Sequence, residues 1–96
     1  MTVYAIAQLR IHDQVPFERY AAGFMPVLRQ YGGRLVVADG EPEVIEGEWD
    51  GNRVVVFAFD DRDAFTTWAS SPEYQAIVPD RWDAAETTFL LVRGVD

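Results

Sequence analysis

The sequence has no cysteine and no lysine, and His12 is its single histidine. The lack of cysteine excludes disulfides, thiolate metal ligands and cysteine nucleophiles. The lack of lysine excludes Schiff-base catalysis through a side-chain amine. Because no second histidine and no carboxylate at ligand spacing accompanies His12, the sequence predicts no metal site.

Several other signatures are also missing. No apolar run approaches the roughly 20 residues that span a bilayer, and Met1–Tyr4 already has the character of a strand rather than of a signal peptide. We therefore expect a cytoplasmic protein that does not bind membranes. Neither a phosphate loop nor a dinucleotide fingerprint is present, so we expect no cofactor. The formal net charge of −8 repels phosphate backbones, so nucleic acid is not an expected partner.

What is present is typical of a folded protein. Hydrophobic residues make up 49% of the 96 residues and aromatic residues 14%, which predicts one globular domain over residues 1–96. Strand character is found in residues 3–11, 34–38, 43–48, 53–59 and 87–92. Helical character is found in residues 15–31, after the acidic cap at 60–63, and after Ser71.

Prolines and capping residues predict where the helices begin, bend and end. Asp13 and Ser71 are N-cap residues, and Gly32-Gly33 supplies a left-handed stop for the first helix. Pro26 lies inside that helix and predicts a kink about one turn earlier. Pro79 is expected to end or bend the last helix.

The order of these elements predicts an α+β fold of the ferredoxin-like βαββαβ type, with a four-stranded antiparallel sheet and helices on one face. The segments 54–59 and 89–92 are apolar on both faces of the sheet. About six apolar side chains on the uncovered face, at about 2 kcal/mol each, rival the stability of a whole domain. We therefore expect a homodimer, the alternatives being a different partner protein or a third layer.

Four motifs taken in order resemble a known family. They are Tyr31-Gly32-Gly33, the run from Glu41 to Gly47, the run from Ser71 to Ile77, and the closing strand Phe89-Leu90-Leu91-Val92. Together they are similar to domain of unknown function 1330, in the dimeric α+β barrel superfamily. That superfamily includes cofactor-free monooxygenases, muconolactone isomerase and stress-responsive barrel proteins. The resemblance implies a fold and a dimer, and it carries no assigned reaction.

Two residues are candidates for catalysis. His12 ends the first strand, where its side chain can reach the mouth of a pocket, and its titration range suits acid–base work. The alternative is an ordinary turn residue. Tyr20 lies on the inward stripe of the first helix, where it is either a catalytic hydroxyl or a core residue with a satisfied hydroxyl.

Five residues are candidates for ligand binding. Arg53 opens an apolar strand, and an inward arginine needs an anion, either a carboxylate such as Glu46 or an acidic group of a ligand. Trp68 and Tyr74 either line a pocket or belong to the core. Gln8 and Arg10 interrupt an apolar strand, and polar groups in a buried sheet need partners.

Two functions remain open from the sequence. One is an oxygenase- or isomerase-like enzyme that needs no cofactor and acts on a small, largely apolar molecule. The other is a non-catalytic dimer that binds a small ligand or another protein. An enclosed cavity of about 300 Å³ or more, with Tyr, His or Arg side chains converging on it, would favour the enzyme.

Overall fold

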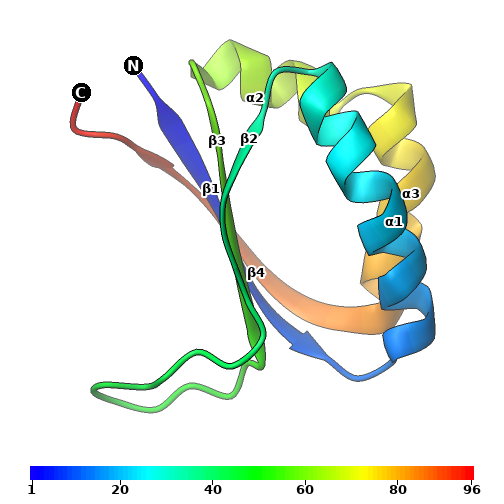
Figure 1. Ribbon diagram of the computed structural model, residues 1–96, viewed down its shortest axis with the longest axis vertical. Helices are drawn as coiled ribbons and strands as arrows, with labels where there is room; N and C mark the ends of the chain where they lie inside the picture. Colours follow the sequence, from blue (N-terminus) through cyan, green and yellow to red (C-terminus); the bar gives the residue numbers. More distant parts are fainter.

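The computed structural model describes all 96 residues. The elements in chain order are β1 (Val3–Ile11), α1 (Gln14–Gln30), β2 (Arg34–Asp39), β3 (Arg53–Phe59), α2 (Arg62–Ala69), α3 (Pro72–Ala84) and β4 (Ala85–Arg93). The four strands form one antiparallel sheet in the order β2-β3-β1-β4. Figure 1 shows the helices together on one side of this sheet. The expected ferredoxin-like α+β fold is confirmed.

Alternation along β1 divides the sheet into an inner and an outer face. Val3, Ala5, Ala7 and Leu9 are buried beneath the helices, and the residues between them are less buried. Residues paired directly across antiparallel strands share a face. Leu9 pairs with Arg53 on β3 and with Thr87 on β4, so those two side chains also belong to the inner face.

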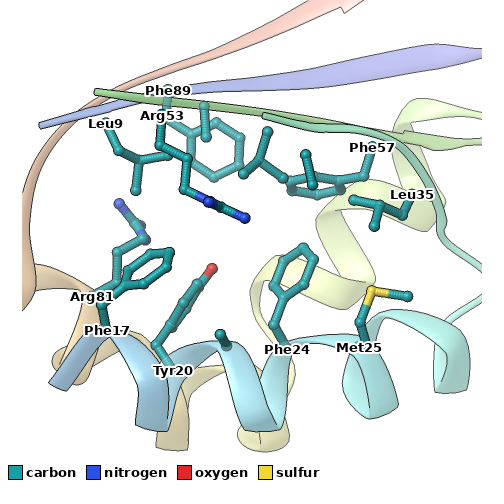
Figure 2. Close-up of a pocket in the computed structure, with 14 residues that line it drawn as sticks. Leu9, Phe17, Tyr20, Phe24, Met25, Leu35, Arg53, Phe57, Arg81 and Phe89 are labelled. Atoms are coloured by element: carbon teal, nitrogen blue, oxygen red, sulfur yellow. The ribbon is translucent and has the colours of Figure 1, made fainter. Parts of the chain in front are cut away.

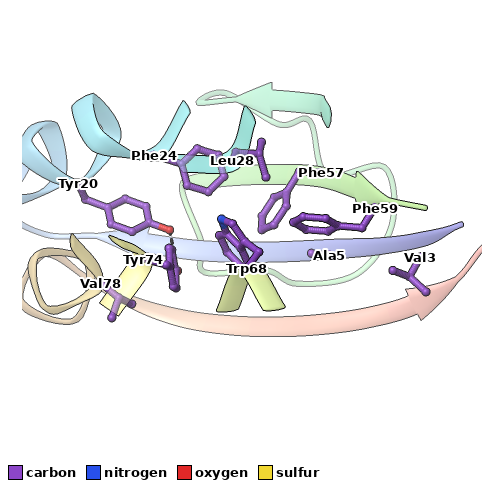
Figure 3. Packing of buried hydrophobic residues seen from close by; sticks show 10 residues of the cluster. All are labelled: Val3, Ala5, Tyr20, Phe24, Leu28, Phe57, Phe59, Trp68, Tyr74 and Val78. Carbon is purple, nitrogen blue, oxygen red and sulfur yellow. Dashed lines mark hydrogen bonds between the residues drawn. The ribbon is translucent and has the colours of Figure 1, made fainter. Parts of the chain in front are cut away.

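The core lies between the inner face and the helices and is rich in aromatic rings (Figure 3). Trp68 of α2 is fully buried, and its ring centroid lies 5.1 Å from that of Phe57 and 4.0 Å from that of Tyr74. Phe24 of α1 meets Phe57 edge-on, with 5.2 Å between the ring centroids. These contacts join all three helices to β3.

The helix caps agree with the sequence. The side chain of Asp13 accepts a hydrogen bond from the backbone N–H of Val15, and that of Ser71 accepts one from Tyr74. Gly32 has a φ of 78° and ends α1 in the left-handed region. Pro79 does not end the last helix, because α3 continues to Ala84.

The expected extended segment at residues 43–48 is wrong. No strand forms between β2 and β3, and this stretch leaves the sheet on the side opposite the helices (Figure 1). Within one copy it meets no strand edge that could satisfy its backbone. Ile45 is 81% exposed. Just before β3, the Asn52 side chain exchanges two hydrogen bonds with the backbone of Ile11.

The outer face of the sheet is apolar and carries no helix. The register places Val37, Val56, Ile6 and Leu90 in one row across all four strands. A neighbouring row pairs Tyr4 with Ala58 and Val92. The expected apolar patch on the uncovered face is therefore present. Polar residues gather at one end of this face, where Arg10 forms an ion pair with Glu86.

Candidate functional site

A cavity of about 160 Å³ lies between α1 and the inner face of the sheet (Figure 2). Twelve of its fourteen lining residues are hydrophobic, which makes the cavity a predominantly apolar space. The two others are Arg53 and Arg81. The hydrophobic lining residues come from α1 and from all four strands. They are Ala7, Leu9, Phe17, Tyr20, Ala21, Phe24, Met25, Leu35, Ala38, Val55, Phe57 and Phe89.

The sequence explains why the space exists. Phe17, Tyr20 and Phe24 are three and four residues apart, so they project from one face of α1 toward the sheet. At the same level, Ala7 on β1, Ala21 on α1 and Ala38 on β2 carry only a methyl group. Large rings thus hold α1 off the sheet, and the small residues leave the gap unfilled.

A pair of tyrosine hydroxyls lies at the inner wall. The Tyr20 hydroxyl shares a hydrogen bond of 2.9 Å with that of Tyr74, and both residues are buried (Figure 3). Burial raises the pKa of Tyr20 well above its ordinary value, and the nearby Tyr74 raises it further, while Arg81 opposes the shift. The Tyr20 hydroxyl therefore keeps its proton at neutral pH and serves as a hydrogen-bond donor or acceptor.

Two arginines enter the cavity from opposite walls. Arg53 comes from β3 and its guanidinium lies 5.7 Å from the centroid of the Phe17 ring. Arg81 comes from α3 and lies 5.9 Å from the Tyr20 ring and 5.6 Å from the Phe89 ring. These distances are within the range of cation–π contacts, which orient the guanidinium planes against aromatic faces.

Neither guanidinium has an acidic partner. The Nε atoms of Arg53 and Arg81 are buried and make no hydrogen bond. The ion pairs of the chain involve Arg10, Arg19 and Arg34 instead. The carboxylate expected for Arg53, that of Glu46, belongs to the exposed stretch between β2 and β3, and the two form no ion pair. The cavity is thus a positive space within an acidic protein.

The structure brings together some of the predicted site residues. Tyr20 and Arg53 both line the cavity. Tyr74 and Trp68 do not line it and lie behind its wall, where Tyr74 holds the hydroxyl of Tyr20 and Trp68 packs in the core.

The other three predicted residues lie elsewhere. His12 is exposed in the turn after β1, and its backbone N–H donates to the carbonyl of Ala84. Gln8 and Arg10 alternate with the inward residues of β1, which places them on the outer face of the sheet.

Arg81 is the cavity residue that sequence reasoning missed. It follows Tyr74 by seven positions and Val78 by three, and both of these are buried on the inward face of α3. That spacing puts Arg81 on the same face of the helix. The helical spacing could therefore have identified Arg81. It was not applied because Pro79 predicted that the helix ends or bends before this residue.

The size of the cavity limits what it can hold. Its volume of about 160 Å³ is roughly half the 300 Å³ that would favour an enzyme, although tyrosine and arginine side chains do converge on it. An apolar cavity of about 150 Å³ is large enough to bind benzene. The cavity, which is not fully enclosed, therefore has room for about one ring. No three His, Asp or Glu side chains are grouped to bind a metal, and none of the helices has the length and apolar character to cross a membrane.

Solved structures with the same fold cover almost the whole chain. A protein of unknown function from Rhodopseudomonas palustris has a TM-score of 0.83 at 16% identity, over 99% of this chain and 83% of that one. A dimeric ferredoxin-like protein from Jannaschia sp. CCS1 has a TM-score of 0.72 at 11% identity, over 98% and 100%. SnoaB, a cofactor-independent oxygenase from Streptomyces nogalater, has a TM-score of 0.65 at 14% identity, over 99% and 94%.

These likenesses establish the fold and leave the reaction open. No curated protein matches the chain in sequence. The family model described as domain of unknown function (DUF1330) matches residues 2–95, nearly the full length. The resemblance carried by the four sequence motifs is therefore confirmed, and this chain belongs to the DUF1330 family.

Proposed function

We propose that this chain is a one-domain, homodimeric barrel that binds a small, largely apolar molecule and acts on it without a cofactor, as an oxygenase- or isomerase-like enzyme. The observation that carries the proposal is the apolar cavity into which one hydroxyl and two guanidinium groups converge. The oxygenase SnoaB has the same fold, which supports this reading.

The cavity suits reactions that build negative charge on a substrate oxygen. Such charge is stabilised by fixed hydrogen-bond donors and positive groups in a largely apolar surrounding. The Tyr20 hydroxyl stays protonated and can donate to a carbonyl oxygen, while Arg53 and Arg81 supply permanent positive charge. Because no lining side chain accepts a proton near neutral pH, a proton released from a substrate C–H or O–H would leave through the open side of the cavity to buffer in solution.

The second candidate function is a binding protein without catalysis. It is favoured by the absence of histidine and of carboxylates from the lining of the cavity. No lining side chain can therefore accept a proton near neutral pH. This candidate shares the ligand with the first and differs only in whether the ligand is converted.

The test is to close the cavity without touching its polar groups. Ala21 lines the cavity and Ala22, the next residue on α1, does not, so Ala21→Leu and Ala22→Leu form a matched pair. We would screen one-ring phenols, lactones and aromatic acids for a rise in Tm. A ligand at ten times its Kd adds about 1.4 kcal/mol, or roughly 5–10 °C for a domain of this size.

The expected result is a ligand that raises the Tm of the wild type and of Ala22→Leu, and that fails to raise the Tm of Ala21→Leu. Oxygen uptake and the absorbance of the bound compound then separate the two functions. Turnover that Tyr20→Phe slows supports the enzyme, and binding without turnover supports the binding protein. A complete lack of ligands, or equal binding by the two leucine variants, would rule out the cavity as the site.

The homodimer rests on the outer face of the sheet. Leu90 is 46% exposed and Val92 38% exposed in a single copy, beside Ile6 and Val56 of the central strands. A contiguous apolar surface of this kind marks an interface. The dimeric relative from Jannaschia supports the same arrangement. In sedimentation at micromolar concentration we expect a particle of twice 10.9 kDa.

A further inference from the structure

The cavity contains two positive groups that the protein itself does not neutralise. Both side chains are partly buried, and burying part of a guanidinium group without a counterion costs free energy, so such groups are normally paired. Of the buried side-chain atoms without a hydrogen-bond partner, two are Arg53 Nε and Arg81 Nε. A third is Thr87 Oγ1, which lies in the same row of the inner face as Arg53.

The missing counterion is not explained by a shortage of acidic residues. The chain has 16 acidic residues against eight arginines. Asp80 is next to Arg81 in the sequence, yet its carboxylate accepts hydrogen bonds from Arg19 of α1 at 3.1 and 3.2 Å. None of the residues that line the cavity is acidic. The charge is thus left available to something that enters from outside.

Both guanidinium groups are held in place before a ligand arrives. Arg53 lies over Phe17, and Arg81 lies near Tyr20 and Phe89 (Figure 2). An aromatic face occupies the flat side of a guanidinium group and leaves its N–H edge free. That edge matches the two oxygens of a carboxylate in a bidentate pair.

The other walls and the volume of the cavity limit which anionic ligand can bind next to the two arginines. Its remaining walls are hydrophobic and its volume of about 160 Å³ is near that of a cavity that binds benzene. A flexible or highly polar acid would lose its hydration against these walls without compensation. A compact ring with one acidic group satisfies both the apolar walls and the two arginines.

We propose that the cavity binds a single-ring monocarboxylate, with the ring between α1 and the sheet and the carboxylate on Arg53 and Arg81. This inference rests on the proposed function, because it assumes that the cavity is the ligand site, and it names the class of ligand. It goes further by assigning Arg81 to that site and by making charge, rather than apolar fit alone, the basis of selection.

The experiment compares two probes that differ in charge and are alike in shape, benzoate and benzyl alcohol, by isothermal titration calorimetry at pH 7 and low salt. Wild-type protein should bind benzoate at least about tenfold more tightly, since a charge-assisted hydrogen bond contributes that much or more. Arg53→Gln and Arg81→Gln should each lose this preference while still binding benzyl alcohol. Arg29→Gln, on the exposed side of α1, is the control and should keep it.

Three outcomes would overturn the inference. Equal affinity of the wild type for the two probes would leave an apolar site that ignores charge, so the proposed function would stand and the carboxylate assignment would fail. A preference for benzoate that survives in both glutamine variants would place the anion elsewhere. If neither probe binds, the ligand class is wrong, and the separate screen on Ala21→Leu decides whether the cavity binds anything. The comparison on the wild type needs no variant to fold.

Discussion

Among single residues, the buried hydroxyl pair of Tyr20 and Tyr74 links the core to the cavity. Tyr74→Phe removes the partner of the Tyr20 hydroxyl, and we expect a loss of about 1 kcal/mol in the free energy of unfolding, measured in urea. Tyr4→Phe on the outer face is the control. Equal stability of Tyr74→Phe and the wild type would contradict the role of the pair.

Glu73 gives a prediction for the dependence of stability on pH. Its carboxylate accepts hydrogen bonds from Gln30 and from the Tyr31 hydroxyl, both at 2.8 Å, and so joins the end of α1 to the start of α3. Its pKa lies below the ordinary 4.5, chiefly because of its own backbone N–H and then because of these two donors. A lowered pKa means stability that is present above pH 4.5 and is lost as the pH falls through the folded value.

The variant that isolates this effect is Glu73→Gln. We expect it to lower the Tm at pH 7, and we expect the difference from the wild type to shrink as the pH falls below 4.5 and the carboxylate takes up its proton. Glu43→Gln, in the exposed stretch between β2 and β3, serves as the control. A Tm difference that stays constant from pH 7 to pH 3 would show that the carboxylate charge plays no part.

At the scale of elements, the end of α1 depends on one backbone conformation. Gly32 has a φ of 78° and nothing within 4 Å of the position where a Cβ would lie. Gly32→Ala therefore meets no clash, and its cost is conformational, about 1–2 kcal/mol of unfolding free energy in urea. Gly32→Asn should cost less, because asparagine tolerates this region. Equal stability of Gly32→Ala and the wild type would mean that the helix ends by another route.

The same scale shows what local sequence signals can and cannot determine. Asp13, Ser71 and Gly32 act through backbone groups within a few residues, and each fixed a helix end as the sequence predicted. The segment 43–48 has the composition of a strand, but a strand must lie against a neighbouring edge, and this stretch leaves the sheet and pairs with neither of the edge strands β2 and β4. Pairing of that kind is a property of the whole fold, so the local pattern misled.

The residues of the candidate site could be predicted from local sequence patterns only in part. Tyr20 and Arg53 were found because helical spacing and strand alternation give the direction of a side chain. The same alternation places Gln8 and Arg10 on the outer face. What the sequence could not supply was the distance between α1 and the sheet, since that depends on which rings and which alanines meet across the gap. The cavity and its size therefore emerge only in three dimensions.

For the whole molecule, the two faces of the sheet differ in what they carry. The inner face carries the core and the cavity, and the outer face carries an apolar surface with no cover in one copy. A partner on the outer face would bury Leu90 and Val92 without approaching Arg53 or Arg81. Assembly and ligand binding should therefore respond to different substitutions, and each can be tested while the other is left intact.

Leu90→Lys tests assembly. Leu90 is 46% exposed in one copy, so a lysine there can reach water in a monomer, whereas in a face-to-face dimer it would bury a charge. We expect sedimentation to change from a dimer to a particle of 10.9 kDa, with the far-ultraviolet circular dichroism of a folded chain. Val15→Lys makes the same kind of change at a residue of α1 that is 64% exposed, and it should remain dimeric. If Leu90→Lys also stays dimeric, the two copies do not meet through the sheet, and the outer face must be covered in another way.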